Sequence, residues 1–186
     1  MIEPKYSTFS PRVCAGFLDG LIFWPIGWLC SFTYSHSGPV PLKILVYIVS
    51  SSVFLVYSIW MHGKFGQTLG KMACKVIVLD VSEQPLSLRQ AVLRDILGVV
   101  LLPVGLAIDI PRIIHGVDIY TPANLTVTDW VMTYSTFGWF VIEVVTMLTN
   151  NKRRALHDFI AGSVVIRKPN KALQATAAAP LVLTET

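Results

Sequence analysis

The chain has 186 residues, of which 53% are hydrophobic and only 14% are charged, and its formal net charge is +4 at neutral pH. Soluble domains carry about 25% charged residues, so this composition excludes an ordinary soluble domain and indicates several membrane spans with short connections. The positive charge follows membrane topology, as shown below, and therefore does not indicate nucleic-acid binding.

The cysteines and histidines give no sign of a disulfide framework or a metal site. The three cysteines are isolated and odd in number, and the four histidines are scattered without ligand spacing. The segment 66–71 (Gly-Gln-Thr-Leu-Gly-Lys) looks faintly like a phosphate-binding loop. It fails as one because three residues separate its glycines, where about four are needed, and because Met72 follows its lysine. We therefore expect no cofactor, and no enzyme activity, since no nucleophile–base arrangement is visible.

The first apolar run, over residues 11–29, carries a polar stripe. Two turns of an α-helix take about 7.2 residues, so Arg12 and Asp19 lie on one face, roughly 10 Å apart along the axis. A carboxylate at membrane depth is costly, so Asp19 is expected to face protein or water rather than lipid. Small residues lie on or beside this stripe and would let another helix approach closely: Ala15, Gly16 and Gly20.

Three further apolar runs predict spans over residues 42–60, 93–114 and 130–148. The third span follows a helix start that Ser87 is placed to cap, and the fourth carries Glu143. The expected fold is therefore an all-α membrane protein with a bundle of four transmembrane helices.

Two short runs outside the spans are rich in β-branched residues and predict strands, Val76–Asp80 and Ser163–Ile166. We expect them to pair beneath the membrane as a small cytoplasmic two-strand element. The membrane domain would then cover residues 1–168. Residues 169–186, which are rich in Ala, Thr and Pro, would form a disordered tail.

The basic residues predict the orientation. All but two of the 15 Lys and Arg residues lie before or at the start of the first span, between the second span and the start of the third, or after the fourth; the exceptions are Lys43 and Arg112. The positive-inside rule then places both termini and the central connection in the cytoplasm. Four spans satisfy this parity, whereas three do not.

A third charged residue of interest, Asp158, follows the fourth span within the segment 154–165. With Arg12 and Asp19 it forms a set that resembles the RDD family of membrane proteins, which is named for one arginine and two aspartates. Other segments add to the resemblance, which covers nearly everything from residue 12 to residue 167: the loop at 66–71, the run at 76–80 and the helix start at 87–95.

The resemblance implies roles for Arg12, Asp19 and Asp158 and a place in a bacterial inner membrane. Transport of ligands not yet identified has been proposed for the family; some members resemble sodium/proton exchangers and others are accessory subunits. The segment 112–148 looks longer here than in a compact family member, so the resemblance assigns no role to Glu143.

Two functions remain open. In the first, Asp19 and Glu143 offer membrane-depth carboxylates that exchange a proton for a small cation, or serve another small solute, with Arg12 gating Asp19. In the second, Arg12, Asp19 and Asp158 form a structural ionic clasp in a non-transporting accessory subunit. A transporter of this size would need a homo-oligomer, whereas an accessory subunit would bind a larger membrane partner; the lipid bilayer surrounds either one.

Overall fold

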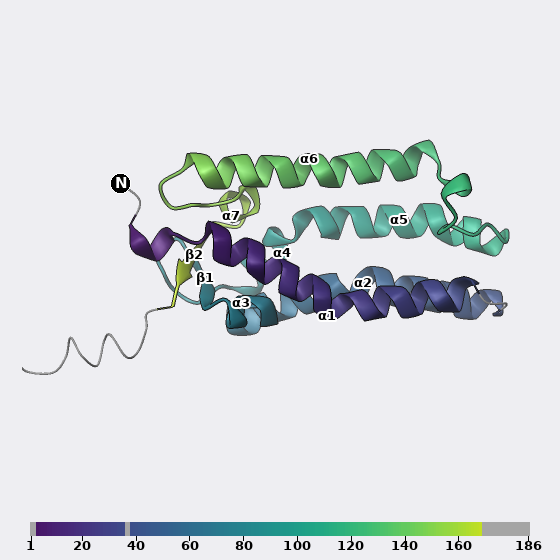
Figure 1. Cartoon of the computed structure of the whole chain (residues 1–186), viewed down its shortest axis with the longest axis horizontal. Helices are drawn as coiled ribbons and strands as arrows, with labels where there is room; N and C mark the ends of the chain where they lie inside the picture. The colour runs from purple at the N-terminus through teal and green to yellow at the C-terminus, as the bar shows by residue number, and fades with distance from the viewer. Residues whose placement is uncertain (1–2, 36–37, 169–186) are drawn as a thin grey trace, which may run out of the picture.

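The computed structural model describes residues 3–35 and 38–168, which are mostly helical (Figure 1). Four helices are long and apolar enough to cross a membrane, which confirms the predicted fold class. Their bounds are α1 Phe9–Ser35, α2 Val40–Phe65, α5 Ile96–Ile114 and α6 Val127–Thr149. Helix α2 packs against both α1 and α5, and α6 runs along the outer side of α5. The predicted disordered tail lies outside the described residues.

The shorter elements gather at one end of the bundle, the left end in Figure 1. They are η1 Pro4–Tyr6, α3 Leu69–Ala73, β1 Val76–Asp80, α4 Leu88–Arg94, α7 Leu156–Ile160 and β2 Ser163–Arg167. The connection between α5 and α6, with η2 Pro122–Asn124, lies at the opposite end. This arrangement brings the N-terminal segment, the central connection and the segment after α6 together, as four antiparallel crossings require.

The two predicted strands do pair. Strands β1 and β2 are antiparallel, with Val78 opposite Val165. Both of these valines are buried in a small apolar cluster with Val76, Leu86 and Ala91. A two-stranded ribbon is only marginally stable by itself, so this packing under α4 is what holds it.

Helix α2 ends where a glycine is required. Gly66 has a φ of 64°, and its N–H bonds the His62 carbonyl to close the helix. A Cβ at this position would lie 2.7 Å from the Val78 carbonyl oxygen. The turn therefore directs the chain back along β1 and begins α3, whose N-cap is Thr68.

The third predicted span is not one helix. Ser87 and Gln90 form a capping box at the start of α4, as the sequence suggests, but the helix breaks at Asp95 before α5 begins. Residues 93 and 94 therefore belong to α4 and not to the apolar span. The break has a polar cause, because Arg94 turns toward α7 while the Asp95 carboxylate accepts a hydrogen bond from Ser58 of α2.

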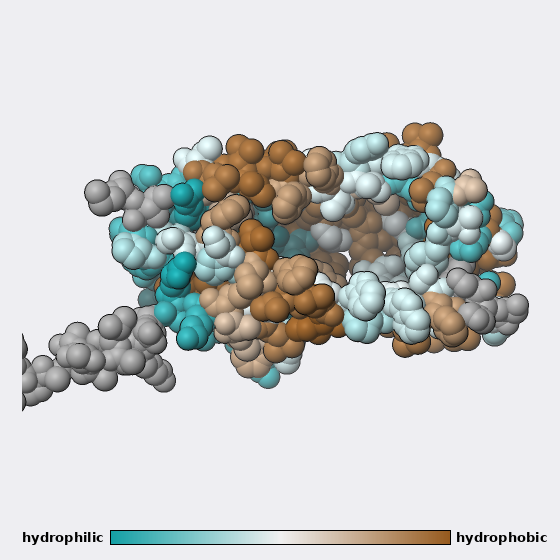
Figure 2. Space-filling model, viewed as in Figure 1, coloured by the Kyte–Doolittle hydropathy of each residue, from teal (hydrophilic) through white to brown (hydrophobic). Residues whose placement is uncertain are grey.

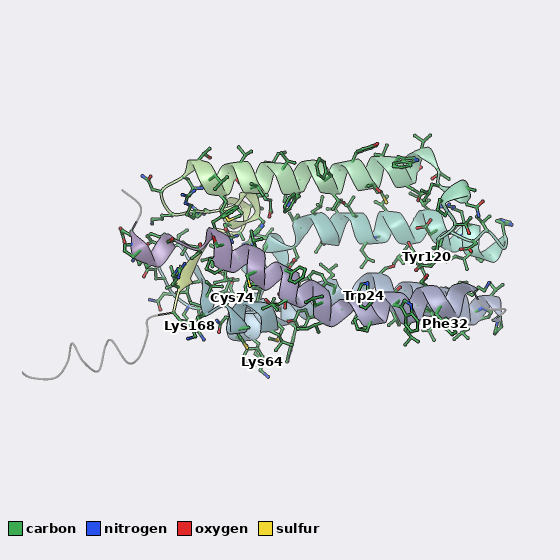
Figure 3. The ribbon with its side chains drawn as sticks, viewed as in Figure 1. Trp24, Phe32, Lys64, Cys74, Tyr120 and Lys168 are labelled. Carbon is green, nitrogen blue, oxygen red and sulfur yellow. The ribbon has the colours of Figure 1, made fainter. Side chains whose placement is uncertain are left out.

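The outer surface of the bundle is apolar and aromatic. Trp24 is 70% exposed on α1, whereas the basic side chains Lys64 and Lys168 lie at the end that holds the strands (Figure 3). The space-filling view shows the molecule hollowed between its two halves, with hydrophilic residues visible inside (Figure 2). An apolar exterior around a polar interior is the arrangement expected of helices in lipid.

Candidate functional site

A cavity of about 590 Å³ lies among α1, α2, α5 and α6, next to α3, α4 and α7. Apolar side chains, such as Phe54 and Phe140, form much of its wall. Six charged side chains also line it: Arg12, Lys71 and Arg94 are basic, and Asp19, Asp95 and Glu143 are acidic. Close-packed protein interiors seldom leave a space of this size, and fewer still surround one with charges.

Asp158 lies behind this wall and is fully buried. Its carboxylate accepts hydrogen bonds from the guanidiniums of Arg12, at 2.7 Å, and Arg94, and from the Ala155 N–H at 2.9 Å. Burial alone would raise the pKa of Asp158, but the two guanidiniums outweigh it and hold the pKa well below its usual range. The cluster ties α1 and α4 to the segment that follows α6.

Asp19 does not belong to this cluster, so the predicted three-residue clasp is wrong in one member. The Asp19 carboxylate accepts hydrogen bonds from the Gly70 N–H at 2.8 Å and the Tyr57 hydroxyl at 3.0 Å. Arg12 and Asp19 share a helix face, but seven residues separate them, and each finds a nearer partner on another element. The place expected for Asp19 beside Arg12 and Asp158 is taken by Arg94.

Gly70 explains how α3 comes close enough to bind Asp19. A Cβ on Gly70 would lie 2.1 Å from the Ala15 carbonyl oxygen of α1. Of the three small residues noted on the first span, Ala15 is buried and has a close neighbour, whereas Gly16 and Gly20 have open space around them. That neighbour is the short helix α3 of the same chain.

Glu143 joins the Asp158 cluster through a histidine. Its carboxylate accepts hydrogen bonds from the Trp139 indole N–H at 2.8 Å and from His157 Nδ1. The other ring nitrogen of His157 faces the guanidinium of Arg12 at 3.2 Å and that of Arg94 at 3.0 Å. Helix α6 is thereby connected to α1 and α4 on one side of the cavity.

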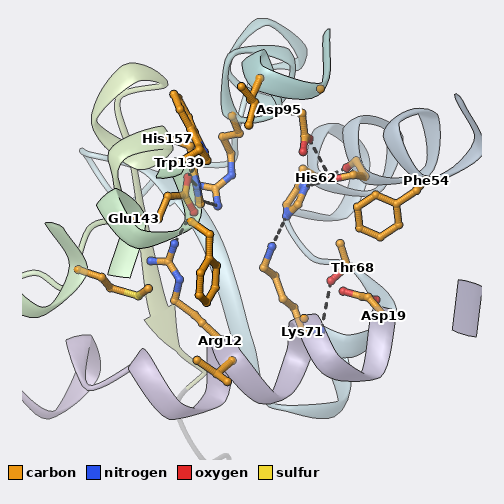
Figure 4. Close-up of a pocket in the computed structure, with 18 of the residues that line it drawn as sticks. Arg12, Asp19, Phe54, His62, Thr68, Lys71, Asp95, Trp139, Glu143 and His157 are labelled. Carbon is orange, nitrogen blue, oxygen red and sulfur yellow. Dashed lines mark hydrogen bonds and ion pairs between the residues drawn. The ribbon is translucent and has the colours of Figure 1, made fainter. Parts of the chain in front are cut away.

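A second polar chain crosses the other side of the cavity (Figure 4). The Lys71 amine lies 2.6 Å from His62 Nε2, and His62 Nδ1 bonds the Ser58 carbonyl oxygen at 2.8 Å. The Ser58 hydroxyl donates to Asp95 at 2.9 Å. Burial, with the nearby Arg94 and Arg12 adding to its effect, lowers the pKa of Lys71 to about 7, and burial raises the pKa of Asp95.

These geometries agree with the comparison with protein families, in which the RDD family model matches residues 6–162. The chain belongs to the RDD family. Neither a curated protein nor a solved structure matches it. The matched range holds Arg12, Asp19 and Asp158, and it ends at Gly162, directly before β2.

The RDD resemblance does not account for the other residues that complete the site: Arg94, His157, Lys71, His62 and Asp95. One signal in the sequence could have indicated His62. Ser58 and His62 are four residues apart, so they share a face of an apolar helix, where polar side chains need partners. For Arg94 and Asp95, no local pattern shows that the helix breaks between them and the span.

The end of the RDD bundle away from the strands has its own ionic contact. Arg112 of α5 donates to Asp109 at 2.6 Å and to Asp129 of α6 at 3.2 Å, and Tyr47 of α2 donates to Asp109 at 2.6 Å. Among residues 3–35 and 38–168, no group of three or more His, Cys, Asp or Glu side chains is placed to hold a metal ion.

Proposed function

We propose that this RDD-family protein exchanges a small cation for protons across the membrane, through the cavity that Asp19 lines. The observation that supports this function is the cavity itself, which lies among the four spanning helices and is bordered by charges from α1, α4, α6 and the α4–α5 junction. Intramembrane charges of this kind mark ion pathways in membrane proteins.

The balance of charges favours a cation over an anion. Three acidic side chains line the cavity together with three basic ones, and Asp158 lies directly behind Arg12 and Arg94. With Asp158 included, acids outnumber bases by one, so an added cation reduces the net charge of the site. A small uncharged solute is the alternative cargo for the same cavity.

The proposed setting is the inner membrane of a bacterial cell, with both termini in the cytoplasm. The described basic residues of the N-terminal segment, the central connection and the segment after α6 all lie at the strand end of the bundle. The positive-inside rule assigns that end to the cytoplasm.

A cavity-filling substitution tests transport directly. Gly16 lines the cavity and has open space around its Cβ position, so Gly16→Phe places a large side chain there without a backbone clash. Gly27, on the same helix, also has open space and does not line the cavity, which makes Gly27→Phe the matched control. The protein is reconstituted in phosphatidylethanolamine/phosphatidylglycerol vesicles that contain a pH-sensitive dye.

A sodium or potassium gradient should then move protons in vesicles with the wild-type or Gly27→Phe protein. The Gly16→Phe variant should lose most of this flux while it remains folded. Equal flux in the three proteins would show that the cavity is not the path. Absence of proton movement in wild-type vesicles under any cation gradient would remove cation/proton exchange, and radiolabelled solutes would then be the next probes.

One observation favours the structural alternative. The buried set of Asp158, Arg12 and Arg94 fixes three elements against one another, as a clasp in an accessory subunit would. This role predicts that the protein leaves the membrane in mild detergent together with a larger partner protein, or as a homo-oligomer. Purified protein that transports cations without any partner would refute a purely structural role.

A further inference from the structure

The contact between Lys71 and His62 joins two bases with no acid between them. The Lys71 amine lies 2.6 Å from His62 Nε2, a distance that needs an N–H on one nitrogen and a free lone pair on the other. His62 Nδ1 is held by the Ser58 carbonyl oxygen at 2.8 Å, so it carries the ring proton and leaves Nε2 as the acceptor. The pair therefore holds one exchangeable proton, and a second one would force the two side chains apart.

Charges surround the pair on every side of the cavity. The basic groups are the guanidiniums of Arg12 and Arg94, and the acidic groups come from α1, the α4–α5 junction, α6 and α7. The titratable and charged residues that line the same cavity are Arg12, Asp19, Arg94, Asp95, Glu143 and His157, and Asp158 lies behind them. The acids favour proton binding at the Lys71–His62 pair. The guanidiniums and burial weaken that binding, so that the proton can be released.

The other candidate proton carriers are already engaged. Asp19 accepts hydrogen bonds from the Tyr57 hydroxyl and the Gly70 N–H, and Glu143 accepts from Trp139 and His157. Lys71 is different because its ammonium has no carboxylate partner among the described ion pairs. A base that meets only another base releases its proton more readily than one paired with an acid.

We propose that Lys71 and His62 form a binding site for one exchangeable proton, and that this proton, rather than one on Asp19, is the coupling ion of the exchange on which the inference rests. When the proton leaves, the cavity becomes more negative by one charge and accepts one monovalent cation. When the proton returns, the ammonium repels that cation. The exchange is therefore one proton for one monovalent cation, and it carries no net charge.

Proton binding is measured without any transport assay. Protein labelled with ¹³C at the lysine ε-carbons is placed in lipid nanodiscs, and the signals are followed by NMR from pH 5 to pH 11. The Lys71 signal is identified by its loss in Lys71→Arg. We expect it to titrate close to neutral pH, in agreement with its pKa of about 7, whereas exposed lysines titrate at about pH 10.4. A Lys71 signal that titrates with the exposed lysines would overturn the proton site.

The coupling is tested in the vesicles described above. Lys71→Arg and His62→Gln should each lose the pH dependence of the cation flux near neutral pH, and Lys75→Arg, which changes an exposed lysine of the same segment, should keep it. Clamping the membrane potential with potassium and valinomycin should leave the wild-type sodium/proton exchange rate unchanged.

The outcomes distinguish the proposed proton site from the proposed cation exchange on which it rests. Normal flux in Lys71→Arg with unchanged pH dependence would overturn the coupling role and leave transport standing. A flux that follows the membrane potential would overturn one-for-one exchange. A neutral titration of Lys71 without any flux in wild-type vesicles would support the proton site and refute cation exchange itself.

Discussion

Removing the negative charge of Asp158 should destabilise the protein more than any other single charge removal. The carboxylate is fully buried and accepts hydrogen bonds from Arg12, Arg94, the Ala155 N–H and Ser163. In Asp158→Asn, the amide NH₂ replaces an acceptor and faces a guanidinium. Two buried cations lose their counter-charge at the same time.

The expected cost follows from that geometry. Breaking a buried ion pair by removal of one partner costs about 3–5 kcal/mol. Since about 1.4 kcal/mol changes an equilibrium constant tenfold, the ratio of folded to unfolded protein should fall by roughly two to three and a half powers of ten. The measurement is denaturant unfolding of the purified protein in detergent micelles, followed by tryptophan fluorescence, because Trp139 lies next to the cluster through Glu143.

A matched control separates burial from charge. Glu83→Gln also removes an acid that pairs with a basic residue, Lys5, but that pair is exposed at the surface. Its effect should be much smaller than that of Asp158→Asn. The double variant Asp158→Leu/Arg94→Met should recover part of the loss, because it removes a stranded cation together with its partner. A cost below about 1 kcal/mol for Asp158→Asn would refute the reasoning, since such values belong to exposed pairs.

Three other measurements follow from the structure. Gly70→Ala should lower stability by about 1–3 kcal/mol in the same assay, because its Cβ would meet the Ala15 carbonyl oxygen at 2.1 Å and push α3 away. Lys71→Met should flatten the pH dependence of stability. Wild-type stability should rise between about pH 7, the pKa of Lys71 in the folded protein, and about pH 10.5, its pKa in the unfolded chain. In that range only the unfolded chain keeps the proton on Lys71. Mild oxidation should join Cys14 to Cys74, whose thiols share a hydrogen bond, within one chain; mass spectrometry would show the bridge, and its absence would place α1 away from the α3–β1 turn.

The features that follow from local sequence could be predicted. Four apolar runs of sufficient length give four helices, and β-branched runs bounded by turns give the strands β1 and β2. Ser87 followed by Gln90 gives the cap of α4, since side chains three residues apart meet at a helix start. Even the pairing of the two strands could be expected, because charge distribution places both segments on one side of the membrane.

The partners of buried charges could not be predicted in the same way. Arg94 lies 64 residues from Asp158 in the chain, and the two meet only because the helix breaks at Asp95. A break is hard to foresee where the sequence has neither proline nor glycine. The partners of Asp19 were hidden for a related reason, because one of them, Gly70, donates a backbone N–H, which no side-chain pattern in the sequence indicates.

The corrected partners also make the two open functions distinguishable. Asp158, Arg12 and Arg94 hold elements together, so their substitution should lower stability and transport together. Lys71 and His62 border open space and bond each other, so their substitution should change transport while the fold persists. If substitution of each charged residue of the cavity lowered the stability of the protein in proportion to its loss of flux, the charges would be structural and the clasp would be the better description. A variant at Lys71 that keeps the fold and changes only the pH dependence of flux requires a working ion path, since a purely structural residue cannot produce that separation.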